Sequence, residues 1–141
     1  MNLWIYPIGK NVYTFELKDG KILDGNIDSF KHNIVINNFP DETWWHVRNN
    51  YSKVEIGDNV YIYATKSNKN SGIVGYAEVM KKRDKNTDED KEDRKEIALT
   101  FNIEECKRLI ANPIPLKRQD SPRSPLGIVS EECQKYISSK K

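Results

Sequence analysis

Two adjacent tryptophans and the polar stretch that follows them are the residues best suited to chemistry in this chain. Trp44 and Trp45 precede Arg48-Asn49-Asn50-Tyr51, which combines planar hydrogen-bond donors and acceptors with an aromatic ring. In a strand, neighbouring side chains point to opposite faces, so one indole can enter a core while the other faces solvent or a cavity. A nucleobase needs ring faces for stacking and amides for its Watson–Crick edge. The pattern therefore predicts a site for a flat heteroaromatic base.

Basic residues concentrate toward the C-terminus, where they are candidates for phosphate contact. Residues 107–141 hold eight Lys and Arg against three Asp and Glu, although the whole chain is only +2. A basic segment on a near-neutral body is compatible with a nucleic-acid partner, and both DNA and RNA fit. The alternative is that these side chains are simply solvated. The phosphate-binding candidates are Lys117, Arg118, Ser121 and Arg123.

The sequence contains no recognisable catalytic motif. Nucleophilic catalysis needs a Ser or Cys with a His and an orienting acid, but His32 and His46 sit in no such pattern. There is no Gly-rich phosphate loop, no HExxH and no CxxC. Cys106 and Cys133 lack metal-ligand spacing, so we expect inert thiols, no metal and no cofactor. Binding without catalysis is favoured; the alternatives are a small RNA- or nucleotide-processing enzyme and a protein-interaction module.

The elements that position the site are expected around Val54–Val79. After the turn signal Gly57-Asp58, Asn59–Thr65 alternates apolar residues with Tyr and Thr, which predicts a strand with two different faces. The polar stretch Lys66–Gly72 is a connection, and Ile73–Val79 is a second strand. Gly72 and Gly75 indicate a bulge or a close approach. Such a bent strand pair is suited to the wall of a small barrel.

Other segments extend the same pattern. Residues 81–96 include fourteen charged side chains, seven of each sign, and are expected to form a solvated, mobile loop. Asn102 with Glu105 predicts a helix up to Ala111, and Ser130 predicts the start of a last helix. Asp19-Gly20 predicts a hairpin turn. Further strands are expected at Leu3–Ile8, Val12–Leu17, Thr43–Val47, Glu96–Phe101 and Ile114–Arg118, and Asn33–Asn37 is compatible with another.

Length and composition indicate one domain over residues 1–141. A chain of 141 residues can bury a core, and a mean hydropathy of −0.77 is typical of a polar surface. No run is long enough for a membrane span, and the N-terminal segment lacks the pattern of a signal peptide. We expect a cytoplasmic protein with no membrane contact. Short strands with two short helices predict an α+β fold, a small mixed or antiparallel barrel flanked by helices.

The order of these motifs resembles the EVE domain of the PUA-like superfamily. The resemblance rests on Gly57-Asp58 before an aromatic-rich strand, then Gly72-Ile73-Val74-Gly75 leading to Ala77-Glu78-Val79. Val47-Arg48-Asn49 looks like the loop that enters the family's pocket, and Ile114–Leu126 looks like its closing segment. The opening differs, because EVE domains often follow an early Trp with Lys-Ser-Glu-Pro, whereas Ile5-Tyr6-Pro7-Ile8 follows Trp4 here.

The resemblance, with a more distant one to YTH readers of methylated RNA, implies an aromatic cage for a flipped, unpaired or modified nucleobase. The strands that begin and centre the fold would contribute to it, together with the pocket loop. Mapped onto this chain, the implied base-binding residues are Trp4, Trp44, Trp45, Arg48, Asn49, Tyr63 and Thr65. Ser121 and Arg123 would lie in the closing loop. Each of these residues also has an ordinary structural interpretation, as core, strand or surface.

Overall fold

The structure is a computed structural model that describes residues 2–9, 14–39, 41–65, 71–86, 93–117, 120–122 and 126–140. Its strands are β1 (Leu3–Ile8), β2 (Thr14–Glu16), β3 (Ile22–Asp24), β4 (Thr43–His46), β5 (Asn59–Ala64), β6 (Gly72–Asn86), β7 (Asp93–Phe101) and β8 (Gly127–Ile128). They form one sheet in the order β3-β2-β4-β7-β6-β5-β1-β8. The pairing of β1 with β5 is parallel, whereas β5 with β6 and β6 with β7 are antiparallel. The predicted central strand pair is confirmed as β5 and β6.

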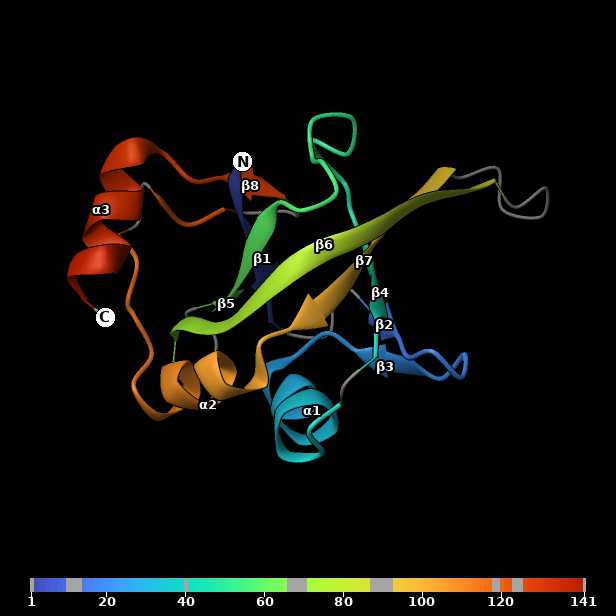
Figure 1. Cartoon of the computed structure of the whole chain (residues 1–141), viewed down its shortest axis with the longest axis horizontal. Helices are drawn as coiled ribbons and strands as arrows, with labels where there is room; N and C mark the ends of the chain where they lie inside the picture. The colour runs from blue at the N-terminus through green and yellow to red at the C-terminus, as the bar shows by residue number, and fades with distance from the viewer. Residues whose placement is uncertain are drawn as a thin grey trace.

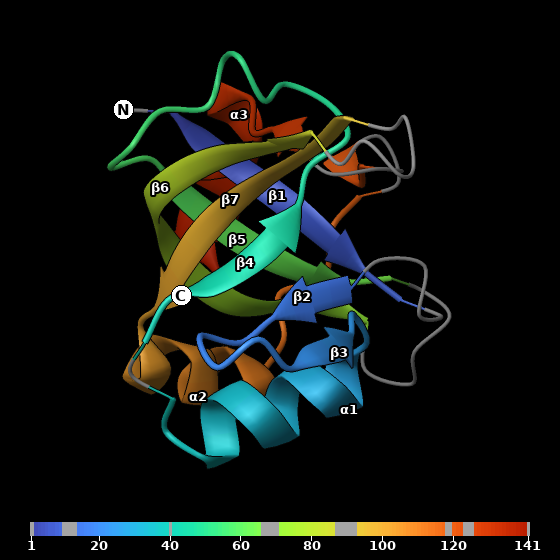
Figure 2. The same cartoon turned by 90° about the vertical axis from the view of Figure 1, so that its right-hand side faces the viewer.

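Helices cover two parts of this sheet (Figure 1). Helix α1 (Ile27–Phe30) continues directly into the π-helix η1 (Lys31–Ile36), and lies with α2 (Ile103–Ala111) below the sheet in that view. Helix α3 (Glu131–Ser139) lies on the other side, near β1 and β8. The predicted α+β class is confirmed. The sheet is strongly curved (Figure 2), but its edges are β3 and β8, and no pairing between described residues joins them, so the closed barrel is not confirmed.

The curved sheet separates two hydrophobic cores. The inner core holds Trp4, Tyr6 and Trp45 with side chains from α1 and η1, whereas the outer core lies between β1, β5 and β6 and the helices α2 and α3. Alternation along the strands decides which core a residue enters. Tyr61 and Tyr63 therefore enter the outer core, where they are 4% and 3% exposed. The Tyr-bearing face of β5 is packed beneath the helices α2 and α3.

The expected strand at Asn33–Asn37 is wrong, because this region is helical. Asn26 caps α1 by accepting a hydrogen bond from the backbone N–H of Ser29 at 2.8 Å. Phe30 and Ile34, one helical turn apart, are both fully buried in the inner core. Two apolar residues at this spacing form one helical face, and burial of that face outweighs the strand propensity of the local Ile-Val-Ile sequence.

The expected loop at residues 81–96 is largely strand. Strand β6 continues to Asn86 and β7 begins at Asp93, and the two remain paired from Ala77↔Phe101 to Asn86↔Asp93. In Figure 1 this hairpin runs beyond the rest of the sheet. Opposite charges face each other across the pairing, as in Arg83↔Glu96 and Asp84↔Lys95, and such pairs favour the extended ladder. Residues 87–92 lie outside the described part of the chain.

The predicted helix starts and turn are confirmed. The Asn102 side chain accepts a hydrogen bond from the N–H of Glu105 at 3.1 Å, and Ser130 accepts one from Cys133 at 3.2 Å. The Asp19-Gly20 turn joins β2 and β3, with Gly20 at φ +91°. Of the expected strand Val12–Leu17, residues 14–16 form β2, and residues 12 and 13 lie outside the described residues.

Gly75 explains why the inner core and β6 can approach closely. A Cβ at this position would lie 2.7 Å from Phe30 Cζ and 3.1 Å from Ile62 Cβ. The register between β5 and β6 also shifts at Ile62/Tyr63, so the strand bulges beside the glycine. Both features predicted from the glycine positions, a bulge and a close approach, are present.

We expect Gly75→Ala to destabilise the protein. An overpacked core costs about 1–3 kcal/mol, more than the roughly 0.4–1 kcal/mol that replacing Gly with Ala gains through the unfolded chain. Urea denaturation should show a lower midpoint with an unchanged slope. In a Phe30→Leu background, Gly75→Ala should lower the free energy of unfolding by less than it does in the wild type, because the ring carbon that collides with the new Cβ is absent. An unchanged midpoint for Gly75→Ala would contradict this packing.

Candidate nucleic-acid interface

The loop after β4 carries two of the predicted base-binding residues. Arg48 and Asn49 are exposed there, directly after the strand that ends at His46. Asn50 shapes the loop with a left-handed backbone at φ +64°, and its carbonyl accepts hydrogen bonds from the N–H groups of Lys53 and Val54, both at 3.0 Å. This loop, residues 47–50, is called the pocket loop below. It is a defined turn that presents Arg48 and Asn49 to solvent.

This loop is attached to a segment that lies far away in the sequence. From here on, the name closing segment refers to residues 120–122 and 126–129, which overlap the end of the stretch Ile114–Leu126 named above. The Asn50 side chain donates to the Leu126 carbonyl at 2.8 Å, and the Leu126 N–H donates to the Asn49 carbonyl at 3.2 Å. Leu126 itself is buried in the inner core. The pocket loop is thus joined to Leu126 of the closing segment by two hydrogen bonds.

The closing segment also contacts β5, through another predicted pair. Ser121 Oγ lies 3.3 Å from Tyr63 Oη and donates to the Lys117 carbonyl at 3.2 Å. Thr65 lies just beyond the end of β5, where its N–H donates to the Ile8 carbonyl at 3.0 Å. The structure therefore brings Asn49 and Tyr63, from two separate stretches, against the closing segment, to which Ser121 belongs.

Trp4 and Trp45 lie inside the fold. Both are 0% exposed and belong to the inner core. The Trp4 indole N–H donates to Asp58 Oδ2 at 3.0 Å, and the Trp45 indole N–H donates to Thr43 Oγ1 at 2.7 Å. Phe15 stacks on Trp45 with ring centroids 4.4 Å apart. In this structure both rings support the strands around the site and have no surface open to solvent.

Trp44 points to the opposite face from Trp45 and is half-buried. The guanidinium carbon of Arg83 lies 4.0 Å from the Trp44 ring centroid. Arg83 is itself held by ion pairs to Glu16 and to Glu96, the latter at 3.1 Å. The predicted split of the tryptophan pair, one inward and one outward, is confirmed, and the outward indole makes a cation–π contact.

Sequence reasoning missed a second group of cations beside the pocket loop. Lys82 Nζ lies 4.5 Å from the Tyr51 ring centroid and donates to the Val54 carbonyl at 2.9 Å. Lys95 Nζ lies 5.7 Å from the same ring. Burial raises the pKa of Tyr51, and the nearby Asp84 raises it further. These lysines belonged to the expected loop, so only the paired hairpin reveals that they flank an aromatic ring.

Of the predicted phosphate-binding residues, the structure describes Lys117 and Ser121. Lys117 is exposed, and its Nζ lies 5.4 Å from the Tyr136 ring centroid on α3. Arg118 and Arg123 lie outside the described residues. Lys117 and Ser121 are joined through the hydrogen bond to the Lys117 carbonyl, so at least this part of the predicted set is local to the closing segment.

A comparison with protein-family models matches the EVE domain over residues 28–125, more than half of the chain. The chain belongs to the EVE domain family. The match begins within α1 and ends before β8 and α3. EVE domains belong to the PUA-like superfamily, which is compatible with nucleic-acid binding. Searches of curated proteins and of solved structures found no match.

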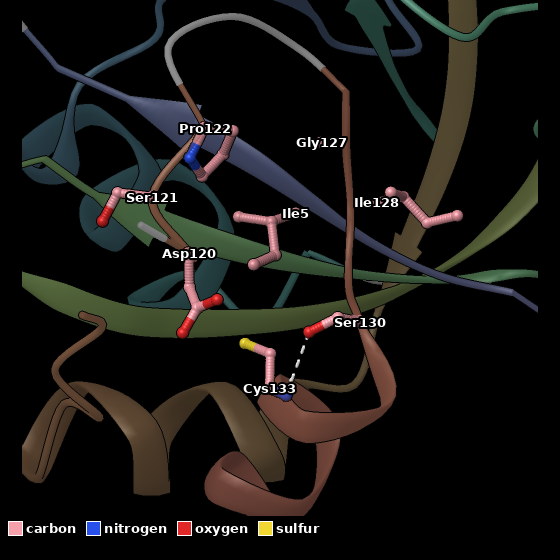
Figure 3. Close-up of a pocket in the computed structure, with 8 residues that line it drawn as sticks. All are labelled: Ile5, Asp120, Ser121, Pro122, Gly127, Ile128, Ser130 and Cys133. Atoms are coloured by element: carbon pink, nitrogen blue, oxygen red, sulfur yellow. Dashed lines mark hydrogen bonds between the residues drawn. The ribbon is translucent and has the colours of Figure 1, made fainter. Parts of the chain in front are cut away.

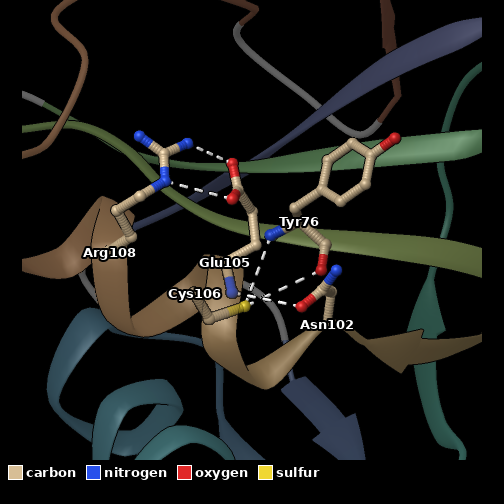
Figure 4. A network of polar contacts seen from close by, with 5 residues as sticks. All are labelled: Tyr76, Asn102, Glu105, Cys106 and Arg108. Atoms are coloured by element: carbon tan, nitrogen blue, oxygen red, sulfur yellow. Dashed lines mark hydrogen bonds and ion pairs between the residues drawn. The ribbon is translucent and has the colours of Figure 1, made fainter. Parts of the chain in front are cut away.

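The thiols of this EVE domain are held in the protonated state. Burial is the main cause that raises the pKa of both Cys106 and Cys133 to about 11. Figure 4 shows Cys106 between α2 and β6, where its Sγ accepts from the Tyr76 N–H at 3.4 Å. A thiol needs to lose its proton to act as a nucleophile or metal ligand. Among the described residues, no group of three His, Cys, Asp or Glu could hold a metal ion.

Two further observations come from the described residues of the EVE domain, one on its buried carboxylates and one on its helices. The buried carboxylates are Asp58 and Glu96, and Glu96 is paired with Arg83. None of the helices, so far as the chain is described, has the length and apolar character required to cross a membrane.

Asp58 is the buried carboxylate that anchors the EVE domain's first strand. Besides the Trp4 indole, it accepts the N–H of Glu55 at 2.9 Å and the N–H of Asn2 at 3.2 Å. Burial alone would raise its pKa, but these hydrogen bonds and the N-terminal charge outweigh burial and lower the pKa below the ordinary 3.8. The ionised form therefore stabilises the folded state.

We expect Asp58→Ala to cost about 2–3 kcal/mol, since it leaves three donors without their acceptor. Because the folded-state pKa is lowered, the contribution of Asp58 is complete above the unfolded pKa and is lost as the pH falls through the folded pKa. Urea denaturation from pH 6 down to pH 2 should therefore show the wild-type and Asp58→Ala stabilities converging at the acid end. Trp4→Phe, which removes one donor only, is the control. A constant difference at all pH values would argue against an ionised Asp58 as the anchor.

Proposed function

We propose that this EVE domain binds nucleic acid without catalysing a reaction, and holds one flipped, unpaired or modified nucleobase in an aromatic site. One observation supports the proposal: the closing segment contacts both Asn49 in the pocket loop and Tyr63 on β5, in a chain of a PUA-like family. The described residues of the closing segment contact the pocket loop through Leu126 and β5 through Ser121.

Trp44 is the indole best placed to stack on the base. Of the three tryptophans, Trp4 and Trp45 are fully buried, and Trp44 alone has exposed surface. Its ring already stacks with the planar guanidinium of Arg83 at 4.0 Å, which is the type of contact that a base would make. Trp4 and Trp45 would contribute indirectly, because their packing in the inner core holds β1 and β4 in position.

The polar residues of the pocket loop would read the base edge. Arg48 offers up to five N–H donors in a fixed plane, and Asn49 offers both a donor and an acceptor. Both side chains are exposed at the turn that Asn50 holds. The backbone of the nucleic acid would be held by Lys117, Arg118, Ser121 and Arg123, the candidates next to or within the closing segment. Lys82 and Lys95 add positive charge beside Tyr51 on the neighbouring hairpin.

We expect Trp44→Ala to weaken binding to short single-stranded oligonucleotides about 5- to 100-fold. Base–aromatic stacking contributes about 1–3 kcal/mol per base, and each 1.4 kcal/mol is tenfold in Kd. Fluorescence anisotropy with DNA and RNA oligonucleotides, with and without methylated bases, measures the effect. Ile36→Ala, which truncates an exposed apolar residue on η1, is the matched control. Equal affinity for Trp44→Ala and wild type would refute stacking on this indole.

Lys117→Ala should act on the phosphate backbone and not on base identity. Loss of one phosphate contact should reduce the slope of log K against log salt by about 0.7 for a single strand, equally for all sequences. Titrations at several salt concentrations measure this slope. Lys31→Ala, which removes an exposed cation on η1, should leave the slope unchanged. An identical slope for Lys117→Ala and wild type would show that the phosphate backbone of the nucleic acid does not contact Lys117.

A further inference from the structure

A hollow of about 230 Å³ lies outside the first strand, between β1, the closing segment and the start of α3. Figure 3 shows Ile5 in the middle of this hollow, with Pro122 and Ile128 on either side. Ile5 belongs to the outer core, so the hollow is separated by the sheet from the buried tryptophans of the inner core. Its lining residues do not include Trp44, so it is distinct from the proposed stacking position.

The backbone of the closing segment gives the hollow its narrow shape. Gly127 pairs with Ile5 across the β1–β8 ladder. A Cβ on Gly127 would lie only 2.6 Å from Pro122 Cβ, so the two parts of the closing segment are pressed together at this point. Pro122 and Gly127 are thus in direct contact, which closes the hollow on this side. At about 230 Å³ the space is below the range of roughly 300–1,000 Å³ typical of drug-sized ligands, and is suited to a single base.

The polar groups of the hollow are one carboxylate and two hydroxyls. The Asp120 backbone is fixed by its N–H, which donates to the Lys117 carbonyl at 3.0 Å. Ser121 Oγ is near Tyr63 Oη, and Ser130 Oγ accepts the capping hydrogen bond from the Cys133 N–H. The two hydroxyls are therefore already engaged. Asp120 also raises the pKa of the Cys133 thiol, after burial, which is consistent with its carboxylate facing into the hollow beside that sulfur.

We propose that this hollow binds a planar nucleobase that presents two adjacent N–H donors, the pattern of the Watson–Crick edge of guanine, with Asp120 as the acceptor. An ionised carboxylate only accepts hydrogen bonds, and it can accept two parallel N–H bonds at once. Guanine supplies its ring N1–H and its 2-amino group side by side. Adenine supplies one amino donor next to a ring acceptor, which would face the carboxylate lone pairs without a hydrogen bond.

Such a base could belong to a nucleic-acid strand or to a free guanine nucleotide, and both would present the same edge. Lys117 precedes Asp120 by one short turn and is exposed, so it is placed to pair with a phosphate of either ligand. The hollow itself does not depend on the proposed function. The binding of a nucleic-acid strand in the hollow does rest on the proposed function, since that nucleic acid would then contact both Trp44 and the hollow.

Isothermal titration with guanosine, inosine and adenosine 5′-monophosphates tests the site. Inosine lacks the 2-amino group, so the order of affinity should be guanosine, then inosine, then adenosine. We expect Asp120→Asn to weaken guanosine monophosphate binding tenfold or more, because a hydrogen bond to a charged acceptor is lost. Glu132→Gln, which removes a nearby exposed negative charge on α3, is the matched control and should change affinity less than twofold.

The same comparison with oligonucleotides separates the two sources. A preference for strands that contain guanine, lost in Asp120→Asn, supports the hollow as a subsite for nucleic acid. Preference for free guanosine monophosphate with no binding of strands supports the hollow and overturns the proposed function. Strand binding without preference for guanine and unaffected by Asp120→Asn, combined with no preference for free guanosine monophosphate, overturns the hollow as a guanine site and leaves the proposed function intact. Equal affinity for guanosine and adenosine monophosphates also overturns the assignment of the hollow to guanine.

Discussion

The hydrogen bonds received by Asp58 are the constraint on which the rest of the structure depends. One buried carboxylate accepts from the Trp4 indole of β1, from the Glu55 backbone in the turn before β5, and from Asn2 at the start of the chain. Its backbone carbonyl accepts the N–H of Val79, which belongs to β6. Three strands are thereby placed in register at one point. A buried charge is tolerated there because both carboxylate oxygens accept hydrogen bonds.

This anchor decides the role of each side chain on the first strand. With Trp4 bound to Asp58, Trp4 and Tyr6 face the inner core, and Ile5 faces outward. The parallel pairing of β1 with β5 then aligns Ile5 with Tyr61 and places Tyr63 near the closing segment. The hollow over Ile5 and the border formed by Ser121 and Tyr63 both follow from this alternation. A shift of one residue would move every one of these groups to the other face.

The outer surface has a different basis, because it is built from paired charges on the long β6–β7 hairpin. Arg83 connects Glu16, Glu96 and the Trp44 ring across neighbouring strands. Lys82, its neighbour in sequence, points to the other face and approaches Tyr51. A run of charges that lacks apolar periodicity can therefore still form ordered strands, provided that cross-strand partners of opposite sign and aromatic rings lie opposite them. This is the reason that the stretch could not be identified as strand from its composition.

Local patterns in the sequence determined much of the fold of this EVE domain. The strand pair after Gly57-Asp58, the Asp19-Gly20 turn, the capped helices after Asn102 and Ser130, and the opposite directions of Trp44 and Trp45 all depend on neighbours within a few residues. Such features follow from backbone conformation and alternation, which a sequence displays directly. The family could also be read from short motifs, because their order is a property of the chain itself.

Tertiary structure alone decided which aromatic residues remain available. Trp4 is held by Asp58 and Trp45 by Phe15 on the neighbouring strand and by Thr43 on its own strand, so indoles suited to a cage by their type became part of the core. The helix at residues 27–36 likewise formed because Phe30 and Ile34 fill the inner core beside Gly75. The hollow around Ile5 required the closing segment to return to β1. Each of these outcomes depends on burial between distant residues, and burial is a property of the packed molecule that local sequence does not encode.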